Sequence, residues 1–321
     1  SVLEFEPRKH VITSKKTIKR GAEVQSIQVD KVSCLFRTCV DVDIFPIEIM
    51  SVTSRDRSDG SQLDIKFELE AGVAAEDLEL TNLRMYLHDD QKRPVSRVLY
   101  LWLFRYLDEI ELEVDFRSGG PKQYTYSKRQ ISAVGFESEE SLLPGSDDVF
   151  SGYRLIQEFF QLPEKFLFFD LNDVGKHVCQ KNAAGFKVSF KFNRAFDGAV
   201  KIRKDNIRLH CAPIANLFER DADPILLEHN RNEYLVRPQT DSLTTMEVFS
   251  VQHVESKVKG QSTRINYLPF ESFKHQLQYT ESQEHFYKLN ARPSVLGEGL
   301  DYYISFHSQA QQDYFTQTVS L

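Results

Sequence analysis

The chain has few residues of the kinds that build disulfide scaffolds or membrane spans. Its 321 residues include four cysteines, three methionines and one tryptophan. Four cysteines are too few for a disulfide scaffold in a chain of this length. No run approaches the roughly 18 consecutive apolar residues of a transmembrane helix. We therefore expect no membrane span and four reduced, mostly buried thiols, at Cys34, Cys39, Cys179 and Cys211.

Motifs for catalysis, nucleotide binding and metal binding are also missing. The sequence contains no G-x-S-x-G elbow, no P-loop and no G-x-G-x-x-G. Its nine histidines are dispersed, without H-x-x-x-H, H-x-H or Cys-x-x-Cys spacing. Neighbouring acidic pairs such as Glu139-Glu140 are typical of solvated turns rather than of a glycosidase pair. The sequence predicts neither an enzyme nor a cofactor or metal site.

An excess of positive charge is absent as well. The chain has 40 basic and 47 acidic residues, a net charge of −7. A mildly acidic chain is a poor candidate for nucleic-acid binding. The basic clusters at residues 15–20 and 201–204 are typical of solvated strand faces and turns. We expect no nucleic-acid partner.

Aromatic and alternating apolar residues, by contrast, are abundant. The chain has 24 phenylalanines and 13 tyrosines, a bias that favours β-rich cores. Residues 63–69 and 186–192 alternate strictly between apolar and polar, as half-buried strands do. A wide apolar stripe after Pro94 predicts a helix over 95–106. We predict a mainly β (α+β) fold with short helices and two or more β-sandwich-like units.

Two parts of the chain resemble each other and indicate an internal duplication. Each alternating strand is followed, after a loop, by an Asn-apolar-Arg-apolar element, at Asn82 and at Asn206. The alternative is coincidence, because alternating strands resemble one another readily. The predicted organisation is a first β-rich unit over 1–120 with helix 95–106, a connector with a helix and a strand over 121–171, and a second β-rich unit over 172–321.

Residues 152–171 are the most informative stretch, with six aromatic residues in twenty. Leu155, Ile156, Phe159 and Phe160 recur on one broad face of a helix. Pro163 cannot continue that helix, and residues 166–171 form a short apolar run typical of a buried strand. This helix, stop and strand are typical of an assembly element rather than of an active site.

This stretch also resembles the signature of the TssF (ImpG/VasA) family, baseplate subunits of the bacterial type VI secretion system. A second matching stretch covers residues 211–225, and shorter matches occur at 34–39 and 231–234 in the same order. The resemblance extends over roughly residues 5–306. Family members are longer, and the chain begins with Ser1 and carries no signal peptide. We interpret it as the central portion of such a protein.

The resemblance implies a structural, cytoplasmic protein that scaffolds tube and sheath assembly. TssF proteins join TssG in a wedge, typically with two TssF copies per TssG, together with TssE and TssK, and the wedges surround the VgrG spike. No membrane insertion is implied. The residues that it makes candidates for structure or interface are Tyr153, Arg154, Glu158, Phe159, Phe160, Pro163, Glu164, Lys165, Phe166, Phe168 and Asp170, and, in the second stretch, Pro213, Asn216, Leu217 and Phe218.

Two questions stay open at this point. The first concerns the polar residues of the signature, which either form interlocking ion pairs within the chain or face a partner. These residues are Arg154, Glu158, Glu164, Lys165 and Asp170. The alternative function is a carbohydrate-binding β-sandwich, which needs a flat platform of exposed aromatic rings. Because most aromatic residues occupy the apolar phase of strands or helices, the pattern predicts that they are buried.

Overall fold

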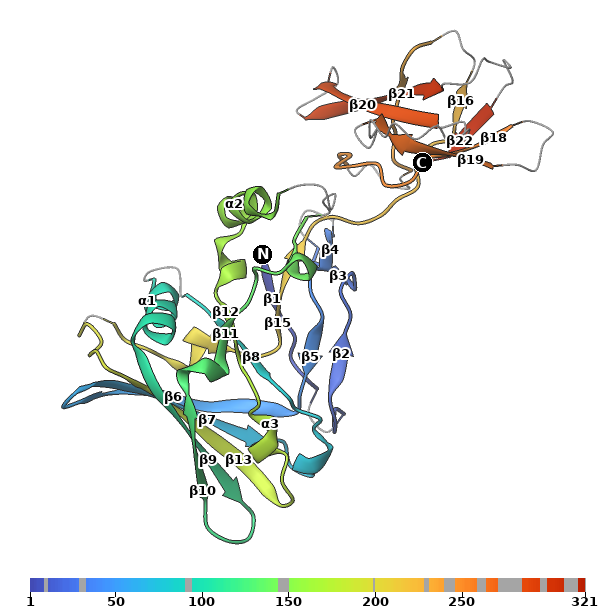
Figure 1. The fold of residues 1–321 in the computed structure, drawn as a ribbon. Coiled ribbons are helices and arrows are strands. Elements are labelled where there is room, and N and C mark those ends of the chain that lie inside the picture. Colours follow the sequence, from blue (N-terminus) through green and yellow to red (C-terminus); the bar gives the residue numbers. More distant parts are fainter. Residues whose placement is uncertain are drawn as a thin grey trace, which may run out of the picture. The chain divides into compact units, whose positions relative to one another are not determined.

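The structure is a computed structural model that describes residues 1–8, 11–28, 33–89, 94–143, 150–198, 200–227, 231–239, 246–258, 264–270, 285–294, 299–308 and 317–320. The chain is mainly β, which confirms the predicted class, and it divides into two compact units (Figure 1). Unit 1 comprises Ser1–Ile27 and Ser33–Asn216, and unit 2 comprises Gln28–Val32 and Leu217–Leu321.

The largest sheet of unit 1 is antiparallel, in the strand order β10-β9-β13-β7-β6. Its strands are β6 (Ile47–Arg57), β7 (Gly60–Leu69), β9 (Leu107–Phe116), β10 (Lys122–Ser127) and β13 (Ala183–Phe192). The two strictly alternating segments are β7 and β13, and they pair with Ile65 opposite Val188. Both side chains are fully buried on one face. On the other face Lys187 and Lys191 form ion pairs with glutamates of β9.

A second sheet packs on this one in the order β11-β12-β8-β14. Its strands are β8 (Leu83–Leu87), β11 (Ile131–Ala133), β12 (Phe168–Leu171) and β14 (Ile207–Arg208). The rings of Phe169 on β12 and Phe190 on β13 lie 6.3 Å apart, and both sheets contribute to one hydrophobic core. The alternation of the strands thus produces two layers around a shared interior.

The chain termini of unit 1 meet in a third sheet, ordered β1-β15-β4-β3, beside a β2-β5 ribbon. Its strands are β1 (Val2–Glu4), β3 (Glu23–Gln25), β4 (Leu35–Thr38) and β15 (Cys211–Ala215), and the ribbon consists of β2 (Lys16–Ile18) and β5 (Val42–Ile44). Val2 lies opposite Pro213. Residues from the first and last strands of unit 1 therefore stabilise each other.

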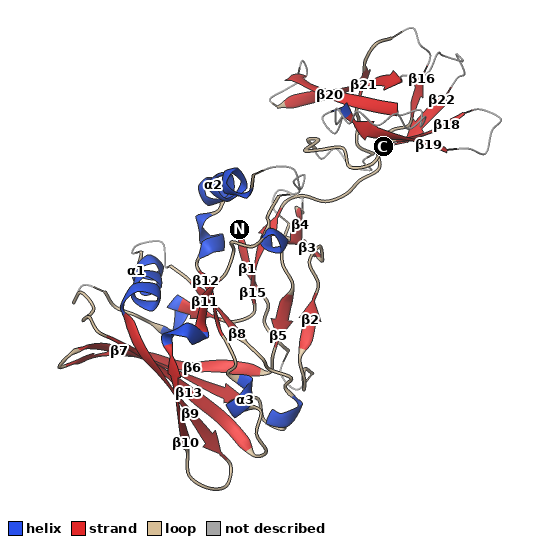
Figure 2. Cartoon of the chain, viewed as in Figure 1, coloured by secondary structure: helices blue, strands red, loops and turns tan. Residues whose placement is uncertain are grey.

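Helices form only a small part of the chain (Figure 2). They are α1 (Val95–Leu101), which continues as π-helix η2 (Trp102–Tyr106), α2 (Ser151–Gln161), α3 (Gly175–Val178) and the 3₁₀ turns η1 (Ala75–Asp77), η3 (Lys128–Gln130), η4 (Ser138–Glu140), η5 (Pro163–Phe166) and η6 (Lys204–Asn206). The helix predicted over 95–106 is confirmed in extent, and its second half has π geometry.

Unit 2 is built on one sheet, in the order β16-β22-β18-β19-β20-β21-β17. Its strands are β16 (Ile225–Leu227), β17 (Tyr234–Leu235), β18 (Glu255–Val258), β19 (Arg264–Pro269), β20 (His285–Pro293), β21 (Leu300–Ser308) and β22 (Gln317–Ser320). β19 and β20 pair in parallel and the other pairs are antiparallel. Val254, Ile304 and Val319 are nearly inaccessible to solvent and centre a separate core.

The division into units differs from the boundaries predicted at residues 120 and 171. β13 lies in the predicted second unit, yet it pairs with β7 and β9 of the predicted first unit. The structure divides the chain between Asn216 and Leu217 instead. The difference arises because strand pairing joins segments that are distant in sequence, and hydrophobic periodicity does not report such partners.

Candidate functional site: an outward-facing aromatic helix

The first signature stretch folds as the predicted helix, stop and strand. α2 ends at Gln161, and the N–H of the capping residue Leu162 donates to the carbonyl of Glu158. Pro163 follows with no N–H to continue the ladder. Residues 163–166 form the turn η5 rather than part of the strand, which begins at Phe168. Pro163 is therefore the residue that separates the helix from the sheet.

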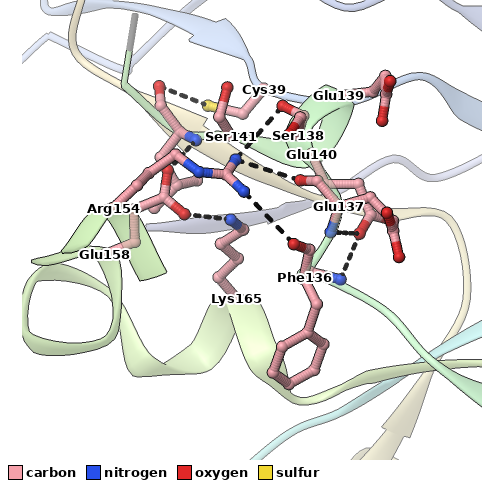
Figure 3. Close-up of polar contacts among 12 residues, drawn as sticks. Cys39, Phe136, Glu137, Ser138, Glu139, Glu140, Ser141, Arg154, Glu158 and Lys165 are labelled. Atoms are coloured by element: carbon pink, nitrogen blue, oxygen red, sulfur yellow. Dashed lines mark hydrogen bonds and ion pairs between the residues drawn. The ribbon is translucent and has the colours of Figure 1, made fainter. Parts of the chain in front are cut away.

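Arg154 holds α2 against a loop of unit 1 by hydrogen bonds alone. Its guanidinium donates to the carbonyl oxygens of Glu137 at 3.2 Å, Ser138 at 3.3 Å and Phe136 at 3.3 Å (Figure 3). A planar guanidinium presents several donors at fixed angles and matches such a cluster of carbonyl groups. Arg154 therefore points toward its own chain rather than away from it.

Glu158 is one turn further along and anchors the same side of α2. It is the one residue of α2 that is buried, with an exposed fraction of 0%. Its carboxylate pairs with Lys165, which is 1% exposed, and accepts a hydrogen bond from the N–H of Leu142 at 2.8 Å (Figure 3). Burial lowers the pKa of the Lys165 ammonium. A buried charged pair defines an orientation more reliably than it adds stability.

The loop that receives these two side chains is itself tied down. Glu140 accepts from the N–H of Gly135 at 2.6 Å (Figure 3), and Gly135 has a φ of +104°, where a Cβ would lie 2.8 Å from the carbonyl oxygen of Lys165. Arg84 on β8 pairs with Asp170 on β12 through contacts of 2.8 and 2.9 Å and lies 3.6 Å from Glu140. These contacts connect the loop to the sheet.

The aromatic face of α2 consequently points away from the protein. Phe150, Tyr153, Ile156, Phe159 and Phe160 are 72%, 72%, 58%, 53% and 79% exposed. A helix on a globular surface normally turns its apolar stripe inward, so the expectation that these aromatic residues are buried is wrong for α2. It holds for η5 and β12, where Phe166 and Phe168 are 8% and 2% exposed.

A groove runs beside this face, between α1, α2 and η5. Its volume is about 440 Å³, and the residues that line it include Tyr100, Phe136, Leu155, Ile156, Phe159 and Phe160. Arg97 of α1 is the one charged residue of the lining. Sequence reasoning missed Arg97, Tyr100 and Phe136, because they come from segments outside the signature and reach it only through folding.

The second signature stretch begins beside the first and then leaves unit 1. Phe168 and Cys211 share a small hydrophobic cluster with Tyr86, and Pro213 is buried on β15. Glu164 is exposed at the rim of an adjacent pocket that Cys211 also lines. Asn216 is the last residue of unit 1, and the chain continues in unit 2 from Leu217. The Arg220 guanidinium stacks over the Phe218 ring at 5.0 Å.

The described residues contain no cluster of three or more His, Cys, Asp or Glu side chains placed to hold a metal ion. In the same part of the chain, no helix has the length and apolar character to cross a membrane. The exposed rings of α2 do not form a flat platform for sugars either, since Phe159 and Phe160 meet at 77° and Phe150 and Tyr153 at 78°. The geometry fits protein contact better than carbohydrate stacking.

Comparison with known proteins agrees with the resemblance. The sequence model of the family described as "Type VI secretion system, TssF" matches residues 1–321. The chain belongs to the TssF family. A relative, the type VI secretion system component TssF1 of Pseudomonas aeruginosa PAO1, is 28% identical over 313 residues, which are 92% of this chain and 49% of that protein.

A solved structure supports the same assignment for this TssF chain. A chain of the TssK-TssF-TssG baseplate subcomplex, determined by cryo-electron microscopy, superposes with a TM-score of 0.82 at 26% identity. The match covers 100% of this chain and 58% of that chain. The TssF chain described here thus spans about half the length of its relatives.

Proposed function

We propose that this TssF chain is a structural part of a type VI secretion baseplate and that it assembles with TssG and TssK. The family assignment supports the setting, and the matched subcomplex contains proteins of those names. The observation that carries the proposal is the outward aromatic face of α2, whose orientation is set by Arg154 and the Glu158–Lys165 pair. Soluble proteins rarely expose a contiguous apolar surface of this kind unless it binds a partner.

Burial of the apolar face against a partner would favour binding. Fully burying one Phe or Ile side chain contributes about 1.5–3 kcal/mol. Each of the five residues of this face, at positions 150, 153, 156, 159 and 160, is more than half exposed. Their burial against a partner therefore contributes a favourable free energy several times that of one side chain. That gain is needed because association costs at least about 4 kcal/mol in lost translational and rotational freedom.

The finer arrangement is proposed on the strength of the family alone. A wedge would contain two TssF copies and one TssG, with TssE beside them, in the cytoplasm. Such wedges would surround the VgrG spike and act as the platform from which tube and sheath polymerise. In such a wedge, the same surface of TssF would contact different neighbours in the two copies. The mechanism is then mechanical: rearrangement of obligate, largely apolar contacts releases the sheath.

Co-purification of this chain, and of the longer full-length protein, with co-expressed TssG and TssK tests the proposal. We expect a stable complex that the double substitution Ile156→Ser and Phe160→Ser abolishes without lowering the melting temperature. The matched control is Met50→Ser, a substitution of an apolar residue that is 44% exposed on the edge strand β6. If the full-length protein forms the complex and this chain does not, the contact lies outside this chain. If neither protein forms a complex with TssG and TssK, the proposal is contradicted.

A further inference from the structure

We propose that the groove between α1 and α2 binds an amphipathic helical segment of a baseplate partner, and that a carboxylate on this segment pairs with Arg97. The inference rests on the proposed function and specifies the chemistry of the partner. It concerns how the contact is made, which neither the family assignment nor the matched subcomplex states.

The form of the groove matches a single helix. α1 supplies Arg97 and Tyr100 on one wall, α2 supplies Ile156, Phe159 and Phe160 on the other, and Phe166 of η5 lies below. A concave, apolar channel of about 440 Å³ between two helices accepts side chains spaced three or four residues apart. It is not closed by the chain's own polar groups, because Arg154 and Glu158 are held on the opposite side of α2.

Arg97 has no charge partner within the described part of the chain. It is exposed on α1 and forms no hydrogen bond or ion pair with any described residue. Of the acidic residues around the adjoining pocket, Glu4 pairs with Arg208 at 3.0 Å, Asp89 accepts from the N–H of Ser96 at 2.6 Å, and Glu164 is exposed and forms no ion pair with Arg97. An unpaired guanidinium at the wall of an otherwise uncharged groove favours a ligand that carries a carboxylate.

A second copy of this chain fits the groove poorly. In a two-fold symmetric contact the same patch meets itself, and the residues that line the groove include Arg97 but no acidic side chain. Two copies would place a positive charge opposite a positive charge and gain no ion pair. An anionic membrane surface fits poorly as well. Arg154 and Lys165 contact their own chain, which leaves Arg97 as the one cation of the groove lining, whereas membrane-surface helices carry several cations beside the apolar face.

The test measures binding of full-length protein to a purified TssG–TssK complex at about 50 mM and about 300 mM salt, which span a strong change in screening. We expect Arg97→Glu to weaken binding on the order of 100-fold at low salt, because it places two negative charges together. We expect Arg97→Leu to remove the salt dependence that the wild-type protein shows. Arg105→Glu is the control, since Arg105 is exposed on η2 and does not line the groove.

A photo-crosslinker at position 160, which is 79% exposed, identifies the occupant in the assembled complex. We expect it to capture a partner segment with apolar residues at helical spacing and an acidic residue within one turn of them. Capture of a segment without acidic residues, capture of a second TssF copy, or equal effects of Arg97→Glu and Arg105→Glu would overturn the inference while leaving the baseplate function standing. Failure of the wild-type protein to bind TssG–TssK overturns both.

Discussion

The Glu158–Lys165 pair decides which side of α2 faces the protein. Both groups are almost completely removed from water, and Glu158 also accepts the N–H of Leu142. Rotation of the helix to bury its aromatic face would expose this pair to water and would also remove the three carbonyl groups that accept hydrogen bonds from Arg154. The polar contacts thus maintain an exposed apolar surface that hydrophobic burial alone would remove.

Replacement of one member of this pair is expected to be far more harmful than replacement of both. Lys165→Met leaves the Glu158 carboxylate buried without a counterion, which costs about 3–5 kcal/mol. The double substitution Glu158→Gln and Lys165→Met keeps an acceptor for Leu142 and removes both charges, so we expect it to recover at least half of that loss. Urea denaturation of the wild-type protein, of Glu158→Gln, of Lys165→Met and of the double variant measures these free energies. Additive effects of the two single substitutions would contradict a coupled pair.

His210 gives the protein a predictable pH dependence. Its side chain is 8% exposed, its Nε2 accepts the N–H of Phe45 at 3.1 Å, and burial lowers its pKa to about 4 from 6.5. The neutral imidazole is therefore favoured in the folded state. Its stabilising contribution is complete above pH 6.5 and is lost as the pH falls from about 6.5 to about 4, a total of about 3 kcal/mol.

This contribution is separable from that of other titrating groups by substitution. His210→Gln retains an acceptor for Phe45 but cannot bind a proton in this range, so its unfolding free energy is expected to fall less steeply between pH 6.5 and 4. Urea denaturation across that range makes the comparison, with His253→Gln as the control because His253 is 67% exposed. Identical slopes for His210→Gln and the wild-type protein would show that His210 does not titrate as described.

At the scale of elements, α2 and β12 divide the aromatic signature into two functions. Phe168 on β12 is 2% exposed and packs its ring 4.6 Å from that of Tyr86. Phe160 on α2 is 79% exposed. The turn η5 after Pro163 separates them within a few residues. One short stretch therefore carries core residues and an available surface side by side.

Substitution of each ring by alanine is expected to separate stability from assembly. Phe168→Ala removes a core side chain and is expected to destabilise unit 1 by about 3–5 kcal/mol. Phe160→Ala is expected to change stability by less than about 0.5 kcal/mol while it weakens binding to TssG–TssK. Calorimetry and a pull-down of both variants measure this pair of effects. A large loss of stability in Phe160→Ala would place that ring in the core instead.

The two segments that indicate a duplication are partners within one unit. β7 pairs with β13 in one sheet, and β8 pairs with β14 in the other. The shared asparagines do not have the same contacts: Asn82 accepts the N–H of Asp173, whereas Asn206 donates to the carbonyl of His88. The pairing is compatible with two related halves that face each other, and the duplication stays a prediction.

At the scale of the whole chain, the two units have separate cores. The sheets of unit 1 draw all their strands from residues 1–216, and those of unit 2 from residues 217–321. The second signature stretch carries the chain from one to the other through the exposed residues Asn216, Glu219 and Arg220. An exposed connection between two independent cores is typical of a domain boundary.

Unit 1 is therefore expected to fold without unit 2. A chain of residues 1–216 retains every strand of the three sheets and the β2-β5 ribbon of unit 1, so we expect cooperative thermal unfolding close to that of the same unit in the whole chain. Brief trypsin treatment of the whole chain, with cleavage after Arg220, is expected to release a folded fragment. Circular dichroism and mass spectrometry measure both, and an unfolded 1–216 chain would contradict independence.

Much of the local structure was predictable from sequence because its causes are local. Period-2 alternation predicted β7 and β13, the apolar stripe after Pro94 predicted the helix of α1 and η2, and the missing N–H of Pro163 predicted the end of α2. The assembly role followed from the family resemblance. The contacts of Arg97, Tyr100 and Phe136 in the groove were not predictable, because no sequence spacing relates α1 to α2.

The sequence by itself determined that α2 is amphipathic, where it ends, and to which family the chain belongs. Only the tertiary structure decided which side of α2 is exposed. An amphipathic pattern reports that a helix has two faces, but either face is buried depending on what the rest of the chain offers. Here distant backbone carbonyls and a buried lysine receive Arg154 and Glu158. Those polar partners hold the apolar face in solvent, where it is available for assembly.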